Sequence, residues 1–368
     1  MKSREADKGG AVVPGQRQRP SSNIDFESKP ASVEIRERYA VAINYHFVRP
    51  SLNGVQFRVP AAVTPEKLAG QLAALKENFD FCRCRDLADP KTELPESSVL
   101  ITLDDGASDV VKFAAPVLKQ YGVLASVFVC AQPYTEGRVL AVHKIQILMA
   151  HLGTEKFRAA FYAELERQNA KEIVRDSLEY ANGYNFYPYD NEPVRKLKLD
   201  LNYLIPYQTL QPVLDAVFAD VFGADGEKEA IKQFYLSLDD LKRLVDDGHE
   251  LGLHGYDHKV LPRLSFEEQK RNIQANIDFL APISGKSQLS VAYPYGFCDN
   301  ATKRALKELD IVTGYSMKRE IITPKDLIER WEMPRYDVND CFDKKDNRIN
   351  YQVFSSLSTG DLTKGVCQ

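Results

Sequence analysis

The chain has 368 residues, of which 44% are hydrophobic and 27% are charged, a composition that fits a globular protein with one large domain or two ordinary ones. Its 52 acidic and 48 basic residues are mixed along the sequence, so the net charge of -4 argues against nucleic acid or an anionic membrane as a partner. The first thirty residues contain no apolar run long enough for a signal peptide or a membrane span, which predicts a cytoplasmic protein. The six cysteines show no CxxC pair and no regular spacing, so we expect free thiols.

The chain begins with a polar stretch and then enters regular structure. Residues 1–37 lack apolar periodicity and are rich in glycine, proline, serine and charge, which predicts a disordered or extended arm. Residues 39–46 form a short apolar run that predicts a buried strand, with His46 at its end. A helix is expected from Pro65, because Thr64 suits the N-cap and proline suits the first helical position.

Strands and helices then alternate along most of the chain. We expect strands at residues 99–103, 125–130, 250–253 and 289–293, and helices at about 108–120, between Ser237 and Gly248, and after Ser265. This alternation predicts an α/β fold built on a mostly parallel sheet or on a (β/α) barrel.

Residues 134–234 differ from the sequence on either side of them. They carry long charged and aromatic helical patterns without clear short buried strands, which predicts a helical insertion. Its tyrosines suit a cover over a cleft that sets substrate choice, and an oligomer contact or simple packing explains them equally well. These tyrosines are Tyr180, Tyr184, Tyr187 and Tyr189.

Three of the expected strands end in loops that carry reactive side chains. These loops are Asp104-Asp105-Gly106, His254-Gly-Tyr-Asp-His258 and Tyr293-Pro-Tyr-Gly296. Because active sites of α/β folds gather at the C-terminal ends of the strands, we expect the three loops to meet in one cleft.

Two histidines and a carboxylate in these loops have the spacing of a metal site. His254 and His258 stand four residues apart, so both can bind one ion from a helical turn or a tight loop, and an aspartate completes the set. Zinc suits these ligands, and Co²⁺, Ni²⁺, Fe²⁺ or Mn²⁺ would fit them too. Adjacent aspartates after a strand point in different directions. One of Asp104 and Asp105 can therefore bind the ion while the other faces the attacking water as general base.

These motifs resemble the polysaccharide deacetylases, which are carbohydrate esterase family 4 and share the NodB homology domain. Thr102–Gly106 is similar to the TFDDG motif of that family, with leucine in place of phenylalanine. His254–His258 is similar to its H(S/T)xxH motif, with glycine at the second position. The resemblance implies Asp104 as the general base, and Asp105 with the two histidines as ligands of a divalent metal.

The resemblance also divides the chain into parts. It places a deacetylase domain, a distorted (β/α) barrel of the NodB type, at residues 38–133 and 235–350. The helical insertion at 134–234 interrupts this domain. Residues 1–37 and 351–368 remain as an N-terminal arm and a C-terminal tail.

The chain departs from the family at the arginine that orients the general base. That arginine begins the third motif of the family, and Ala292 occupies its position here. Arg335 is predicted to supply the charge from another loop, with Arg49 and Arg330 as rivals.

A second departure concerns the general acid, which the family usually takes from a histidine near the C-terminus. No histidine follows His258 in this sequence. Asn44-Tyr-His46 resembles the N-terminal histidine motif of the circularly permuted members that act on poly-N-acetylglucosamine. His46 is therefore the predicted acid, with His143 of the insertion as the alternative.

The resemblance implies a metal-dependent deacetylase that acts on an amino sugar or on a glycan precursor such as a nucleotide- or lipid-linked sugar. Tyr295 and Gly296 are expected to shape the cleft floor, where the backbone N–H after the strand-end proline can meet an oxyanion. Trp331 is expected to stack on a sugar, or else simply to pack in the protein. The alternatives are a deformylase or other non-peptide amide hydrolase, and a catalytically silent carbohydrate-binding homologue.

Overall fold

The computed structural model describes residues 39–50, 57, 59, 62–88, 95, 97–168, 187, 189–285, 289–343, 345–350 and 353. The predicted arm at 1–37, nearly all of the tail at 351–368, and two of the tyrosines of the insertion, Tyr180 and Tyr184, lie outside these residues.

A parallel sheet organises the described part of the chain, with the strand order β7-β6-β5-β4-β3-β1-β8 and with β2 also paired to β3. Its strands are β1 (Tyr39–Tyr45), β2 (Asp80–Cys82), β3 (Ser97–Leu103), β4 (Ser126–Val129), β5 (Glu250–Leu253), β6 (Ser290–Ala292), β7 (Thr313–Tyr315) and β8 (Tyr336–Asp337). Every pairing between them is parallel. The carboxyl ends of all these strands therefore lie along one edge of the sheet.

Helices connect the strands, so that each step from one strand to the next is a crossover. They are α1 (Pro65–Lys76), α2 (Cys84–Ala88), α3 (Ala115–Tyr121), α4 (Gln132–Thr135), α5 (Ala141–Leu152), α6 (Thr154–Arg167), α8 (Glu192–Leu199), α9 (Tyr207–Phe222), α10 (Gly226–Phe234), α11 (Leu238–Asp246), α12 (Phe266–Ser284), α13 (Asn300–Glu308), α14 (Pro324–Glu329) and α15 (Val338–Cys341). Short 3-10 or π turns are η1 (Val110–Ala114), η3 (Asp200–Leu204), η4 (Leu261–Arg263) and η5 (Pro294–Gly296).

The helix starts follow the capping signals in the sequence. The Thr64 side chain accepts the N–H of Lys67, and capping boxes at Ser237 and Ser265 begin α11 and α12. The helix expected at about 108–120 instead opens with the π turn η1. Pro116 has no N–H to donate, and the N–H of Ala115 reaches back five residues to the carbonyl of Val110.

The main core lies between the sheet and its covering helices. Val41, Ile43 and Tyr45 of β1 are buried together with Leu68 and Leu72 of α1. Burial of apolar side chains at about 25 cal/mol per Å² is the dominant stabilising contribution in such a layer. The prediction of an α/β fold of the distorted (β/α)-barrel type with a largely helical insertion is confirmed.

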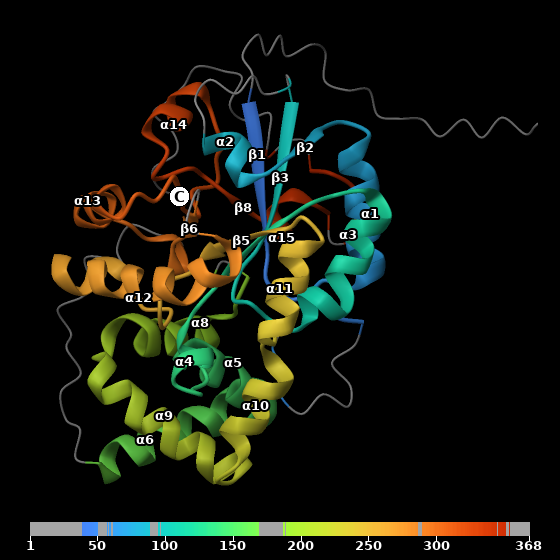
Figure 1. Cartoon of the computed structure of the whole chain (residues 1–368). Coiled ribbons are helices and arrows are strands. Elements are labelled where there is room, and N and C mark those ends of the chain that lie inside the picture. Colours follow the sequence, from blue (N-terminus) through green and yellow to red (C-terminus); the bar gives the residue numbers. More distant parts are fainter. Residues whose placement is uncertain are drawn as a thin grey trace, which may run out of the picture. The chain divides into compact units, whose positions relative to one another are not determined.

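The insertion lies between β4 and β5, where the described residues form helices α4 to α10 and contain no strand. These helices gather below the sheet in Figure 1 and enclose an apolar cluster of their own that includes Phe157, Phe161, Leu214 and Phe218. The exact domain boundaries stay a prediction. Among the described residues, no helix is long and apolar enough to cross a membrane, and the five cysteines there are free.

Candidate active site

The three predicted loops meet at the carboxyl edge of the sheet, and the backbone at this edge is strained. Asp105, His258 and Tyr295 have positive φ angles of 76°, 57° and 59°, which non-glycine residues rarely adopt. Gly106 follows at φ 67°, and a Cβ there would lie 3.1 Å from the Val129 side chain. Strain of this kind persists where surrounding structure holds it, and it clusters at functional sites.

Asp105, His254 and His258 face one another in the buried interior of this edge. Asp105 Oδ1 lies 3.4 Å from the Nε2 atom of each histidine, and the candidate ligand atoms of the three residues all lie within 4.8 Å of one another. Asp105 Oδ1 has no hydrogen-bond partner among the described residues. A buried carboxylate oxygen without a partner, beside two imidazole nitrogens, fits a divalent cation.

A backbone contact sets the tautomer of His254. Its Nδ1 atom lies 2.8 Å from the carbonyl oxygen of Ala292, so Nδ1 carries the proton and donates it there. The Nε2 lone pair is then left to face Asp105. The main-chain N–H of His254 is also held, since it donates to Asn276 Oδ1 at 3.0 Å. Such outer contacts orient a metal ligand before the metal arrives.

Asp104 is the other carboxylate of the pair, and its two oxygens are both held. Arg335 donates to Asp104 Oδ1 and Oδ2 at 2.9 Å each, and Asn44 Nδ2 donates to Oδ2 at 3.0 Å. Arg335 itself is fully buried, and its Nε donates to the carbonyl oxygen of Ser316. This bidentate pair gives Asp104 one fixed orientation.

Only one of the three predicted arginines contacts Asp104. Arg49 pairs instead with Asp109 at 2.5 Å, and Arg330, at the end of α14, stands over the Trp331 ring at 5.6 Å. Asn44, which stands in the Asn44-Tyr-His46 motif, had no predicted role of its own. The sequence signal was its place near the end of the apolar run before His46, and the structure pairs it with Thr102 of β3.

The charges at the site shift the pKa values of its acids and bases. Burial raises the pKa of Asp104, but Arg335 and His254 outweigh it, and the net pKa is lower than usual. Burial likewise opposes ionisation of Asp105, yet the surrounding histidines, His143 first, hold its pKa well below the usual range. Burial lowers the pKa of His254, but Asp104 and Asp105 reverse this and raise it. Burial also lowers the pKa of His258.

A cavity of about 380 Å³ opens onto these residues, and both His46 and Asp104 line it. His46 is half-buried, at the end of β1. His143, the alternative acid, is fully buried in α5 and does not line this cavity. Its Nε2 atom lies 3.3 Å from Asp105 Oδ2, a contact that the sequence analysis did not anticipate.

Tyr295 and Gly296 line the same cavity. The Tyr295 ring meets His258 edge-on with centroids 4.8 Å apart, and its hydroxyl donates to Asn202 Oδ1 at 3.0 Å. Gly296 has φ 80°, and a Cβ there would lie 2.7 Å from the backbone nitrogen of Met317. A larger residue at 296 is therefore excluded.

Trp331, which the sequence analysis expected to stack on a sugar or else to pack, makes contacts with the backbone near this site. Trp331 is not among the residues that line the cavity. Its indole N–H donates to the carbonyl oxygen of Ile311 at 3.0 Å, and its own carbonyl accepts the Tyr293 hydroxyl. These hydrogen bonds give Trp331 a packing role, and its contact with a sugar stays a prediction.

The insertion forms one wall of the cavity. Val142, Ile145 and Gln146 of α5 line it, together with Lys198 and Asn202. This placement agrees with a covering role for the insertion.

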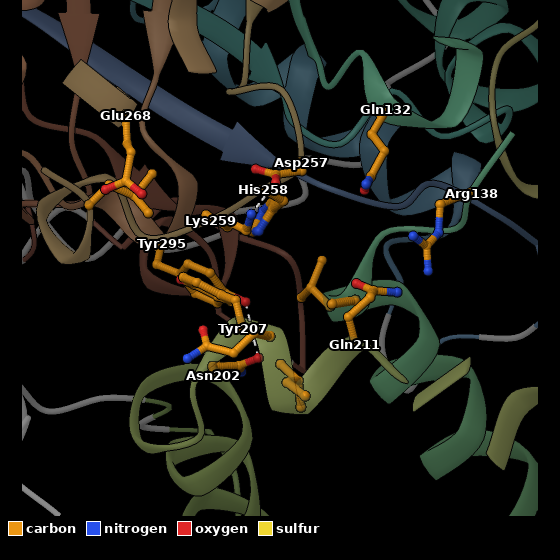
Figure 2. A pocket seen from close by; sticks show the side chains of 15 residues that line it. Gln132, Arg138, Asn202, Tyr207, Gln211, Asp257, His258, Lys259, Glu268 and Tyr295 are labelled. Carbon is orange, nitrogen blue, oxygen red and sulfur yellow. Dashed lines mark hydrogen bonds and ion pairs between the residues drawn. The ribbon is translucent and has the colours of Figure 1, made fainter. Parts of the chain in front are cut away.

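A second cavity of about 360 Å³ adjoins the first and shares Asn202, His258 and Tyr295 with it. Figure 2 shows Gln211 and Arg138 of the insertion on one side of this second cavity, with His258 and Tyr295 across from them.

A parallel α/β fold with a buried carboxylate–histidine–histidine set and a second, arginine-paired carboxylate at the strand ends is typical of metal-dependent hydrolases. Residues 223–314 match the family model described as polysaccharide deacetylase. This segment contains His254 and His258, and the match confirms the predicted resemblance to that family. The match supports hydrolysis of N-acetyl groups on carbohydrate as the class of activity.

Several solved structures share a distant likeness with this chain. The deacetylase PplD of Streptococcus pyogenes, in complex with acetate, is 15% identical over 82% of this chain and 92% of that chain, with a TM-score of 0.49. IcaB from Ammonifex degensii is 18% identical over 81% of this chain and 91% of that chain, with a TM-score of 0.48. The BpsB deacetylase domain of Bordetella bronchiseptica is 13% identical over 81% and 95%, with a TM-score of 0.45. None of the curated proteins matches this chain.

Proposed function

We propose that this protein is a metal-dependent hydrolase that removes an N-acyl group, the acetyl group in the first place, from an amino sugar or a glycan precursor. One observation carries the proposal. The buried and unpartnered Asp105 Oδ1 lies 3.4 Å from two histidine nitrogens, beside a carboxylate, Asp104, that a buried arginine holds in place.

Asp105, His254 and His258 would hold the divalent cation. When bound, such an ion polarises the acyl carbonyl and makes water a stronger acid. Zn²⁺ is the expected metal, and Co²⁺, Ni²⁺, Fe²⁺ or Mn²⁺ would also fit two imidazoles and a carboxylate. The closed network around His254 supports this assignment, because its Nδ1 proton is already committed to a carbonyl oxygen.

Asp104 acts as the general base that takes a proton from the attacking water. Its lowered pKa keeps it ionised at neutral pH, and Arg335 and Asn44 fix both of its oxygens. A base of low pKa is weak, so it needs a water whose own pKa has been lowered. The role of Arg335 is to hold Asp104 charged and oriented, which replaces the arginine missing at Ala292.

His46 acts as the general acid that protonates the leaving amine. It lines the cavity and is half-buried, so a substrate can reach it. His143 is fully buried behind Asp105 and has no such access. The backbone N–H of Tyr295 is proposed to donate to the developing oxyanion, as expected for the residue after a strand-end proline.

The two adjoining cavities favour a substrate larger than a single small amide. Carboxamide and hydroxyl groups such as those of Gln132, Gln211 and Tyr207 surround the second cavity, and groups of this kind bind the hydroxyls of sugars. The two cavities share His258 and Tyr295, which Figure 2 shows in the wall of the second cavity, so a ligand there can reach a proposed metal ligand. A glycan or a conjugated amino sugar fits this arrangement.

The test is a release assay on defined substrates. Purified protein is stripped with a chelator, reloaded with Zn²⁺, and assayed for acetate from N-acetylated amino sugars of one to four units, and for formate from N-formyl analogues. We expect acetate release to require the metal and to increase with the number of sugar units. The Asp104→Asn substitution should abolish it. Full activity in the stripped protein, or turnover of non-sugar amides alone, would overturn the proposal. Faster release of formate would favour a deformylase, and bound metal without any hydrolysis would favour a silent binding protein.

A further inference from the structure

We propose that the helical insertion is part of the metal centre, because its residue His143 positions the metal ligand Asp105 from behind. The inference rests on the proposed function in one respect, which is that Asp105 binds the metal. It assigns a positioning residue outside the motifs of the deacetylase domain, with an effect on metal affinity that can be measured.

The two oxygens of Asp105 face different partners. Oδ1 points toward His254 and His258, at 3.4 Å from the Nε2 atom of each, whereas Oδ2 lies 3.3 Å from His143 Nε2. A carboxylate that binds a cation through one oxygen keeps its orientation when a donor holds the other oxygen. His143 Nε2 is the ring nitrogen that faces this second oxygen at ion-pair distance, and it has no hydrogen-bond partner among the described residues.

The partners of His143 decide which of its ring nitrogens carries the proton. The Tyr235 hydroxyl lies 2.6 Å from His143 Nδ1 and accepts the backbone N–H of Leu140 at 3.1 Å. The buried hydroxyl proton also needs an acceptor, and His143 Nδ1 is the acceptor that the described residues place beside it, so we assign the hydroxyl as the donor to Nδ1. Because Nδ1 accepts, the proton of the neutral imidazole resides on Nε2, the ring nitrogen that lies 3.3 Å from Asp105 Oδ2.

The imidazole of His143 cannot swing away from Asp105. It is fully buried between aromatic rings, with centroids 4.7 Å from Phe234 and 6.2 Å from Phe47. Phe234 ends α10, the last helix before α11, while Phe47 follows β1 of the sheet. The ring therefore sits where the insertion packs against the barrel, and its rotamer is fixed by both.

The metal loop is also bonded through the backbone to residues 234–236, where the insertion ends and the chain returns to the sheet domain. The N–H of Leu236 donates to the carbonyl oxygen of Gly106 at 3.0 Å, and the N–H of Ser108 donates to that of Phe234 at 2.8 Å. Ala107 and Tyr235 form an antiparallel bridge between these two bonds. The same segment thus holds the turn after Asp105 and supplies the hydroxyl that orients His143.

His143 is an outer partner of the site rather than a fourth ligand. The group of candidate ligand atoms that lie within 4.8 Å of one another comprises Asp105, His254 and His258 but not His143. His143 is also absent from the lining of the cavity, so it stands behind the carboxylate, away from the side that a substrate approaches.

The test measures zinc affinity by competition with a chromogenic chelator for the full chain and four variants. His143→Leu removes the donor, and the affinity should fall about 10–100-fold, the usual effect of losing such a partner. His143→Gln keeps an N–H donor and should recover part of that loss. Tyr235→Phe should lower the affinity less than His143→Leu. His151→Leu makes the same change on the exposed end of α5, beside Phe222, and should leave the affinity unchanged.

A second measurement separates positioning from mere folding. Melting of every variant in excess chelator reports the apo fold, and the Co²⁺ absorption spectrum reports the number of ligands. We expect His143→Leu to keep the wild-type ligand number. If a folded His143→Leu variant kept wild-type zinc affinity, the inference about His143 would be overturned while the proposed function would stand. A Co²⁺ spectrum that shows the loss of one nitrogen ligand would have the same consequence. Failure of the wild-type chain itself to bind any metal would overturn the proposed function as well.

Discussion

Replacement of Arg335 by methionine tests how the candidate base is held. Arg335 is fully buried and donates to both oxygens of Asp104, which is buried as well. Methionine fills much of the same volume but leaves the Asp104 carboxylate with a single side-chain donor, Asn44. The Arg335→Met substitution should therefore lower the free energy of unfolding far more than the same substitution at a surface arginine would.

The magnitude follows from what is left behind in the interior. Breaking a buried ion pair on one side costs about 3–5 kcal/mol, because the other charge stays buried without its partner. Asp104→Asn alone strands Arg335 and should also destabilise the fold. The double variant leaves neither charge buried without a partner. Its decrease in the free energy of unfolding should therefore be smaller, by about 2–3 kcal/mol, than the sum of the decreases in the two single variants.

Urea unfolding at pH 7 with chelator present gives the three free energies of unfolding without a contribution from bound metal. Arg49→Met is the matched control, because it breaks the buried pair with Asp109 and should add independently to Asp104→Asn. The pKa of Asp104 is lowered on folding, so the contribution of the pair is complete above the usual aspartate pKa of about 3.9. It is lost as the pH falls through the lower folded pKa. Additive losses for Arg335→Met and Asp104→Asn would refute this reasoning.

Four further predictions concern activity and metal. In Arg335→Met the acid limb of the kcat/KM profile should move up by about 1–3 pH units, because burial then raises the pKa of Asp104 against the weaker opposition of the histidines alone. An unmoved limb would exclude Asp104 as the base. His46→Ala should lower kcat by about 10²–10⁴-fold with zinc content unchanged, and an intact kcat would exclude it as the acid. After dialysis, elemental analysis should find no bound metal in the Asp105→Ala variant, whereas the Asp104→Asn variant should retain it. Trp331→Phe should leave KM unchanged and reduce stability by about 1 kcal/mol through the lost indole hydrogen bond, and a raised KM would return it to the substrate site.

The local part of the site was predictable from the order of residues. A short apolar run followed by Asp104-Asp105-Gly106 places polar side chains at a strand end, and parallel strands bring such ends to one edge. The four-residue spacing of His254 and His258 likewise depends on a few neighbouring residues. The helix starts at Thr64 and Ser265 are local for the same reason, since a cap needs only the next three residues.

Contacts between distant residues were not predictable in this way. Arg335 reaches Asp104 across 231 residues, and the sequence favoured it while leaving Arg49 and Arg330 as rivals. Nothing in the order of residues separates three arginines in loops, because the choice depends on β8 lying next to β1. Trp331 shows the reverse case, in which a residue suited to sugar stacking turned its indole N–H toward Ile311.

What the sequence by itself determined was the chemistry that meets at the strand ends: two aspartates, two histidines and, through the absence of any histidine after His258, an acid sought at His46. Only the tertiary structure decided which arginine pairs with Asp104 and that His143 lies behind Asp105. The physical reason is the range of the interactions. Strand period, caps and spacing act over a few residues, whereas a buried charge or imidazole finds its partner only when the whole chain packs.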